Sequence, residues 1–533
     1  MAKANKRNKW TKVLIFIAVF IAIVLIANIL VKFFIEKKIR SSFNQFAPYI
    51  KTDFTSIHIH LLAASISIDS VAISYQPNLK KQNKHEIYFN SASLSGINFF
   101  KLVGSKSFYA SAFKINNGRI NLSKYLLNSK DSLPASLFPS AHIPFKKISF
   151  GLIEIKNVDV FDSDSKTQKS LLNGNISLND VTLNKIDSSF SKSNIHFSNA
   201  TTELNNIKYD LPGYHLLSVK KALLNSKDSS LKIDSLKIIP QLGKIEIGKK
   251  IGHQVDRIDA KIENIKVVGL DVKQLMNKKF FAQQLDINNT KVYAFRDRRL
   301  PREMKHQPTP LDYLKNIPAE VRIKNLNLNN ASATSEEFPK EGSQTGYIKI
   351  EHIYIHLSPV LNQPKNSDQK FITANVNGSI MNAGIIKATI NLSLITGVQN
   401  IKGYIENLNL PAMNPSAENL GKFKVESGVL NRLDFDFIAT NEKATGKIIG
   451  VYHDLVVDKL KLKDGKLKEA KLPSFALHHI IIPKNKDASL DVKHRTGKID
   501  YDRDPTRLVT FYLLKSLLDG IRDSFSLGFV LPK

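Results

Sequence analysis

The chain has 533 residues and no cysteine, with 77 basic residues against 47 acidic ones and a formal net charge of +30. The missing thiols exclude a disulfide framework, thiolate catalysis and cysteine–zinc sites, and a chain of this length can bury a large core without them. The basic residues are interspersed, which favours solvated outer faces of long sheets, with attraction to anionic lipid head groups as the alternative.

The first element is an apolar run over residues 13–31, VLIFIAVFIAIVLIANILV. As a helix, such a run spans roughly the 30 Å hydrocarbon core of a bilayer. No small-residue cleavage site follows it, so we predict an uncleaved signal-anchor helix over 13–35 rather than a cleaved signal peptide. The residues expected to face lipid are Val13, Leu14, Ile17, Phe20, Ile23, Ile26 and Leu30.

The segment before the run carries five basic residues and no acidic one over positions 1–12. The positive-inside rule places this tail in the cytoplasm. Long following domains cross the membrane with little regard to their own charge, so we expect the rest of the chain on the other side.

From residue 50 onward one pattern returns: two apolar residues separated by one position, two mostly polar residues, and a second apolar pair. Clear copies start at residues 66, 92, 153, 176, 231, 260, 321, 348 and 455, and weaker ones lie at 204–209, 285–292 and 405–410. Side chains alternate faces along a strand, so the second pair would fall on the wrong face unless a β-bulge at the polar dipeptide restored it. The pattern predicts a mainly β fold over 50–500, an elongated, curved antiparallel sheet with one apolar face. Unrelated strands or tight turns are the alternative.

The connections between these strands carry turn residues. Asn117 and Gly118 predict a hairpin turn between Phe113–Ile115 and Ile120–Leu122. Proline-bearing stretches at 126–144, 296–310 and 359–368 predict connections, and 411–421 predicts a short helix near Asn414.

At the end of the chain, the spacing of the apolar residues changes from that of a strand to that of a helix. Asp504 and Pro505 are expected to cap and begin an amphipathic helix over 504–526, with apolar residues at helical spacing and Gly520 as a weak point. Such a helix either lies on a membrane or packs on the apolar face of the sheet as a cap.

Motifs that carry chemistry are weak. His58 and His60 share one strand face, which fits solvent exposure better than a metal pair, and Glu336 with Glu337 is expected to be solvated. Four arginines at 296–302 could meet lipid phosphate, but a solvated loop paired with Asp297 and Glu303 is favoured. No nucleotide-binding or hydrolase motif is present. We therefore predict no catalytic, metal or cofactor site, no nucleic-acid partner, and a protein that is not an enzyme.

One anchor followed by these repeated strands resembles the AsmA-like envelope proteins of Gram-negative bacteria. The segment 91–102 (SASLSGINFFKL) is similar to the early strand-then-helix signature of that family, and 425–457 to its C-terminal region. The tail, with YDRD at 501–504 and KSLLDGI at 515–521, resembles an uncharacterised branch common in Bacteroidetes. The resemblance implies a single-pass inner-membrane protein with a periplasmic, apolar β-groove that moves phospholipid towards the outer membrane or maintains that membrane.

Acyl chains would then lie along the apolar face. The candidate groove residues, taken from the repeated pairs, are Ile155, Val158, Ile233, Leu236, Ile323 and Leu326. The alternative function is a periplasmic scaffold, in which the sheet buries its apolar face on itself and binds envelope proteins. An open groove favours lipid, and a closed, dry core favours the scaffold.

Overall fold

The computed structural model describes residues 50–60, 62–75, 85–98, 107–122, 145–162, 169–184, 195–366, 368–463, 466–469, 485–486 and 488–525, and the single residues 29, 33, 36, 37, 41 and 101. The tail over 1–12 and the anchor residues Val13, Leu14, Ile17, Phe20, Ile23, Ile26 and Leu30 lie outside them. Within the described part, no helix is both long enough and apolar enough to cross a membrane.

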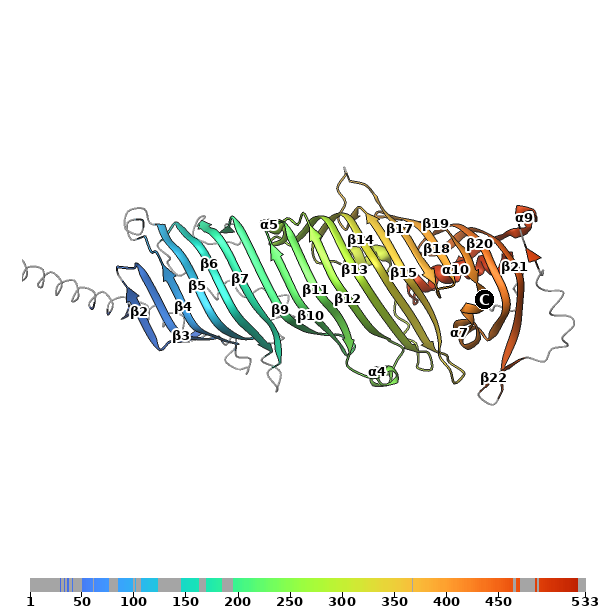
Figure 1. The fold of residues 1–533 in the computed structure, drawn as a ribbon, viewed down its shortest axis with the longest axis horizontal. Coiled ribbons are helices and arrows are strands. Elements are labelled where there is room, and N and C mark those ends of the chain that lie inside the picture. The colour runs from blue at the N-terminus through green and yellow to red at the C-terminus, as the bar shows by residue number, and fades with distance from the viewer. Residues whose placement is uncertain are drawn as a thin grey trace, which may run out of the picture. The chain divides into compact units, whose positions relative to one another are not determined.

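The described chain is mainly β-strand with a few short helices, as predicted (Figure 1). The strands are β1 (Ile50–Asp53), β2 (Ser56–His60), β3 (Ser65–Tyr75), β4 (His85–Ser95), β5 (Ser107–Leu122), β6 (Lys147–Asp162), β7 (Ser170–Asn184), β8 (Ile195–His196), β9 (Asn199–Leu211), β10 (His215–Asn225), β11 (Ser230–Pro240), β12 (Asp256–Val268), β13 (Lys279–Asp297), β14 (Glu320–Phe338), β15 (Gly346–Ser358), β16 (Val360–Leu361), β17 (Phe371–Ile380), β18 (Gly384–Ser393), β19 (Gln399–Asn409), β20 (Phe423–Ala439), β21 (Lys443–Lys463), β22 (Lys466–Glu469), β23 (Asn485–Lys486) and β24 (Thr496–Asp502). The helices are α4 (Lys244–Ile251), α5 (Val272–Leu275), α6 (Pro310–Lys315), η3 (Leu410–Met413), α7 (Asn414–Ser416), η4 (Ala417–Gly421), α9 (Val492–Arg495) and α10 (Val509–Ser524).

Contacts divide the chain into two compact units. The first comprises residues 1–207 and 223–227, and the second comprises 208–222 and 228–533. In the first unit, β2 to β7 and the start of β9 pair in chain order, apart from the short β8. In the second, pairing runs from β11 through β15 to β17, β18, β19, β20, β21 and β24.

The expectation of a purely antiparallel sheet is wrong at two places. β5 pairs with β6, and β13 with β14, in parallel. A parallel neighbour requires a long crossover, which the connection between Asp297 and Glu320 supplies with its loop and α6. Among the described residues, each unit is therefore built on a mixed sheet with one parallel pair among its antiparallel ones.

The polar dipeptides hold both apolar pairs on one face, as predicted. In most copies their second residue adopts left-handed backbone torsions, as at Ser70 (φ 53°), Asp180 (φ 50°) and Ser235 (φ 52°). Across most strand pairs the register is the same before and after this step. The neighbouring strand also departs from regular pairing opposite the step, so neither strand gains a residue on the other. True shifts of register occur at fewer places, among them between Ile155 and Val158. The extra residue is thus absorbed at the polar dipeptide, in most copies by one left-handed residue.

The predicted hairpin at Asn117 is wrong. β5 runs without interruption through Asn117, which takes the left-handed conformation (φ 51°) inside the strand. Asn–Gly tolerates positive φ in a turn and in a bulge alike, so the dipeptide alone does not distinguish them. Here the same repeat unit is present, with Phe113 and Ile115 before the step and Gly118 and Ile120 after it.

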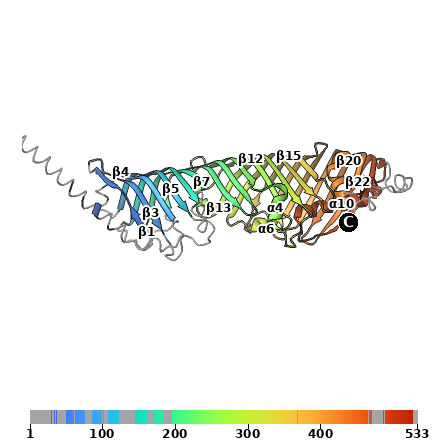
Figure 2. The same ribbon diagram turned by 90° about the horizontal axis from the view of Figure 1, so that it is seen from below.

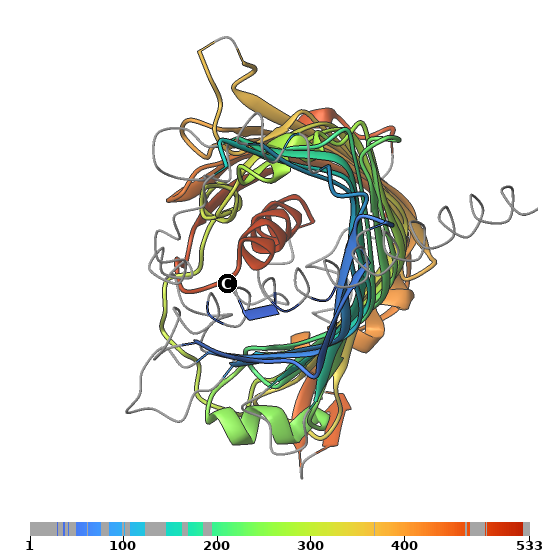
Figure 3. The same ribbon diagram turned by 90° about the vertical axis from the view of Figure 1, so that its left-hand side faces the viewer.

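The C-terminal helix packs on the sheet as a cap. α10 lies against β21 and β24, within the bend of the second unit (Figure 3), and α6 covers the same side of that sheet (Figure 2). The predicted N-cap is wrong. The helix starts at Val509, and the Asp504 carboxylate instead accepts hydrogen bonds from the backbone and hydroxyl of Thr506. The short helix near Asn414 is confirmed as the η3–α7–η4 segment.

Candidate apolar groove

The apolar face of the second unit is organised in rows that cross the strands. Hydrogen-bond register places Ile233 beside Ile265 and Ile265 beside Ile287, and the row continues through Leu328 to Ile355. A second row joins Leu231, Val267, Leu285, Leu326 and Leu357. Such cross-strand neighbours lie about 5 Å apart, so each row is a continuous apolar track.

Packing along these rows changes from one end to the other. At the C-terminal end the first row continues to Phe435 and Ile448, which are 4% and 0% exposed beneath the closing helices. Over β11 to β13 the side chains of Ile233, Ile265 and Ile287 are only half-buried. The first row is therefore a closed core near α10 and half-buried on the earlier strands, whereas Val267 of the second row is 1% exposed on β12.

The six candidate groove residues fall into two kinds. Ile155, Ile233, Leu236 and Leu326 are half-buried, whereas Val158 and Ile323 are 6% and 5% exposed. Ile323 belongs to a packed cluster with Leu311 of α6 and Leu361 of β16. Only the half-buried positions leave apolar surface that a ligand can contact.

In the first unit, Gly118 makes room for the buried side chain of Val158. Gly118 lies between Phe89 and Val158, and a Cβ there would come within 2.9 Å of both side chains. Ile155 is in the adjoining row, flanked by Ile115 and Ile176, and stays half-buried. Apolar tracks thus cross this unit too.

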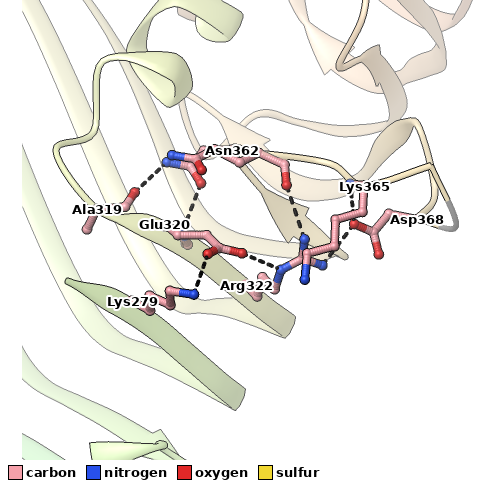
Figure 4. Close-up of polar contacts among 9 residues, drawn as sticks. Lys279, Ala319, Glu320, Arg322, Asn362, Lys365 and Asp368 are labelled. Carbon is pink, nitrogen blue, oxygen red and sulfur yellow. Dashed lines mark hydrogen bonds and ion pairs between the residues drawn. The ribbon is translucent and has the colours of Figure 1, made fainter. Parts of the chain in front are cut away.

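A polar network joins the start of β14 to the loop that follows β16 (Figure 4). The Asn362 side chain accepts from the Val321 backbone at 2.8 Å and donates to the Ala319 carbonyl at 2.6 Å. Arg322 pairs with Glu320 at 2.9 Å and with Asp368 at 2.8 Å. The hydrogen bond to Glu320 raises the pKa of Arg322, so the guanidinium stays charged and joins β14 to the 359–368 loop. This network fixes the loop after β16 to the start of β14, next to the buried Ile323.

The arginines at 296–302 all have acidic partners. Arg296 binds Asp256 through two hydrogen bonds, of 2.8 and 2.6 Å, and Arg298 lies 3.2 Å from Glu337. Arg299 pairs with Asp297 and stacks on Phe338, while Arg302 reaches Asp504. Asp297 is a partner as expected, and these contacts hold the loop against its own sheet.

Glu336 is not the solvated carboxylate that the sequence predicts. Its side chain is 16% exposed and accepts hydrogen bonds from Tyr293 and from Lys244. Burial raises the pKa of Glu336, but the hydrogen bonds from Tyr293, Thr345 and Lys244 together outweigh it and hold the pKa below its usual value. The sequence contained no signal for this contact, because Lys244 belongs to α4, 92 positions away in the chain.

Two histidines, His58 of the predicted pair and His356 of β15, are in polar surroundings. His58 lies 2.9 Å from Asp69, and His356 hydrogen bonds to Asn327 at 2.8 Å. Among the described residues, no group of three potential ligands could hold a metal ion.

Comparison with known proteins adds no name to this arrangement. No protein-family model matches the chain, and no curated protein is significantly similar to it.

Proposed function

We propose that this chain is a membrane-anchored periplasmic protein that handles phospholipid, with acyl chains lying along the half-buried apolar rows of its sheets. One observation carries the proposal. The apolar face is packed near α10, whereas Ile233, Ile265 and Ile287 of the first row are only half-buried over β11 to β13. The resemblance to AsmA-like envelope proteins supports the same function and supplies the inner-membrane location.

The dimensions of the half-buried first row suit an acyl chain. Strands lie roughly 4.8 Å apart, so the row from Ile233 to Leu328 spans about 14 Å across four strands. One leaflet of a bilayer core is roughly 15 Å deep, half of the whole. A methylene left in water costs about 0.8 kcal/mol, so an uninterrupted row keeps a chain that leaves the bilayer out of water.

Photo-crosslinking in cells tests this function. A photoreactive amino acid is placed at Ile233 or Leu236 of the full-length protein, and matched controls carry it at the neighbouring, exposed Lys232 or Lys237. We expect phospholipid adducts at the first two positions and none at the controls. Adducts to an envelope protein in place of lipid at Ile233 and Leu236 would support the scaffold function and reject this proposal.

A charge substitution provides a second test of the proposed function. Leu236→Glu places a carboxylate on the half-buried row, where burial against acyl chains is costly, so the folded protein should lose co-purifying phospholipid. Ile323→Glu serves as the packed-core reference and should destabilise the fold itself. If Leu236→Glu melts as far below the wild type as Ile323→Glu does, the row is a closed core and lipid transfer is abandoned.

A further inference from the structure

A hollow of about 440 Å³ lies on the second unit, on the face opposite the apolar rows. It crosses β14, β15, β17, β18 and β19. One wall is Asn327, His356, Asn375, Thr389 and Lys402, each the register partner of the next. The other wall contains Asn329, Tyr354, Asn377, Lys387 and Tyr404. Because side chains alternate faces, the floor between the walls is backbone, and the floor residues direct their side chains to the apolar face.

Bulges shape this hollow. The register between β15 and β17 shifts between Glu351 and Tyr354, beside the left-handed His352 (φ 49°). A second shift, between β14 and β15, follows Leu328. Bulges bend a strand and increase its twist, so the two walls open where these strands meet.

The walls of the hollow present amide groups, tyrosine rings and lysine side chains. Amide side chains both donate and accept, and hydrogen bonds already orient Asn327 towards His356 at 2.8 Å and Asn375 towards Thr389 at 2.9 Å. Tyr354 is 46% exposed, so its ring is free to contact a ligand. The Tyr404 ring is held by Arg432, whose guanidinium carbon lies 4.0 Å from its centroid. Lys387 adds an exposed positive charge, and Lys402, also exposed, is paired with Asp436 at 3.1 Å.

We infer that this trough binds a linear oligosaccharide that carries acidic groups. Repeated amides and hydroxyls match the hydroxyl groups of a sugar chain, tyrosine rings offer apolar surfaces to its ring faces, and Lys387 attracts its acidic groups. An extended peptide would need a free strand edge for main-chain pairing, and the trough lies on a sheet face. Five strands span roughly 19 Å, which gives room for several sugar units in line.

Binding measurements on the full-length protein in detergent test the inference. The probes are a hexamer of galacturonic acid and the neutral glucose hexamer maltohexaose, titrated by calorimetry. We expect the acidic hexamer to bind more tightly. Tyr354→Ala and Tyr404→Ala should each weaken it by about tenfold, the effect of losing one ring contact of up to about 1.5 kcal/mol. Lys387→Gln should remove most of the preference for the acidic hexamer.

The matched control is Tyr347→Ala, an exposed tyrosine on the same strand β15 but outside the trough. It should bind like the wild type. Equal weakening by Tyr347→Ala and Tyr354→Ala would mean diffuse attraction to a basic surface and overturn the inference, as would binding of neither hexamer. Equal affinity for both hexamers would overturn the requirement for acidic groups. Lipid adducts at Ile233 should persist in all these variants, so the outcome is separate from that of the proposed function.

Discussion

At the scale of the residue, the fold depends on polar side chains that occupy left-handed positions inside strands. Asn117, Asn157, Asn206, Asn289, Asn330 and Asn407 all have φ between 51° and 53°. Asparagine tolerates this region because its short side chain hydrogen bonds locally. Several of these side chains also bond across strands: Asn157 donates to Asn117 at 2.8 Å and Asn330 to Asn289 at 2.9 Å. One residue type therefore turns the backbone and links neighbouring strands at the same level.

Substitution at Asn330 tests this role. Asn330→Val forces a β-branched residue into the left-handed region and should cost about 1–2 kcal/mol of unfolding free energy, measured by urea denaturation. Asn330→Gly accepts the torsion and should cost clearly less. The control Ser335→Val, at an exposed position of the same strand, should be nearly neutral. Equal losses for the valine and glycine variants would show that the lost hydrogen bond to Asn289 dominates instead.

At the scale of the element, α10 closes the C-terminal side of the second unit. Its carboxylates accept hydrogen bonds from backbone groups of β24: Asp523 from Lys498 at 2.7 Å and Asp519 from Asp500 at 3.0 Å. Strand edges with free backbone groups invite pairing with other chains, and these contacts satisfy two of them. Gly520, which the sequence predicts as a weak point of the helix, lies inside the continuous helix α10. It allows the helix to approach β21 and β24, since a Cβ there would lie 2.9 Å from Ile499 and 3.2 Å from Ile448.

The close approach of α10 makes Gly497 a sensitive position. A Cβ at Gly497 would lie 2.1 Å from the Gly520 carbonyl oxygen, a backbone atom that has little room to move. Gly497→Ala should therefore destabilise the protein by about 1–3 kcal/mol in chemical denaturation, the usual cost of overpacking. Leu514→Ala, at a 43% exposed position of the same helix, is the control and should change stability far less. A neutral Gly497→Ala would indicate that α10 is not seated on β24.

At the scale of the whole molecule, two compact units share one construction, in which apolar rows cross the strands on a single face. In the second unit this face passes from a closed core beneath α10 to half-buried rows over β11 to β13. Local stability follows buried apolar contacts, so the two ends of this sheet should open at different free energies.

Hydrogen exchange followed by mass spectrometry measures this gradient. Backbone amides of β20 and β21 should exchange more slowly than those of β11 and β12, because their side chains form the packed cluster. Added phospholipid vesicles should slow exchange in β11 and β12 and leave β20 unchanged. Uniform protection over all four strands without lipid would contradict an uncovered apolar face.

The sequence by itself determined the strands, the single apolar face, the short helix near Asn414 and a helix at the C-terminal end. These follow from alternation and from residues that tolerate positive φ, both of which act over a few positions. Only the tertiary structure decided that Asn117 lies within a strand, that β5–β6 and β13–β14 are parallel, and that Glu336 meets Lys244. It also decided that Ile323 is packed while Ile233 stays half-buried, although both occupy the same repeat pattern. Strand partners and the cover over a face come from segments far apart in the chain, and a local pattern of alternating residues carries no information about which distant segment arrives there.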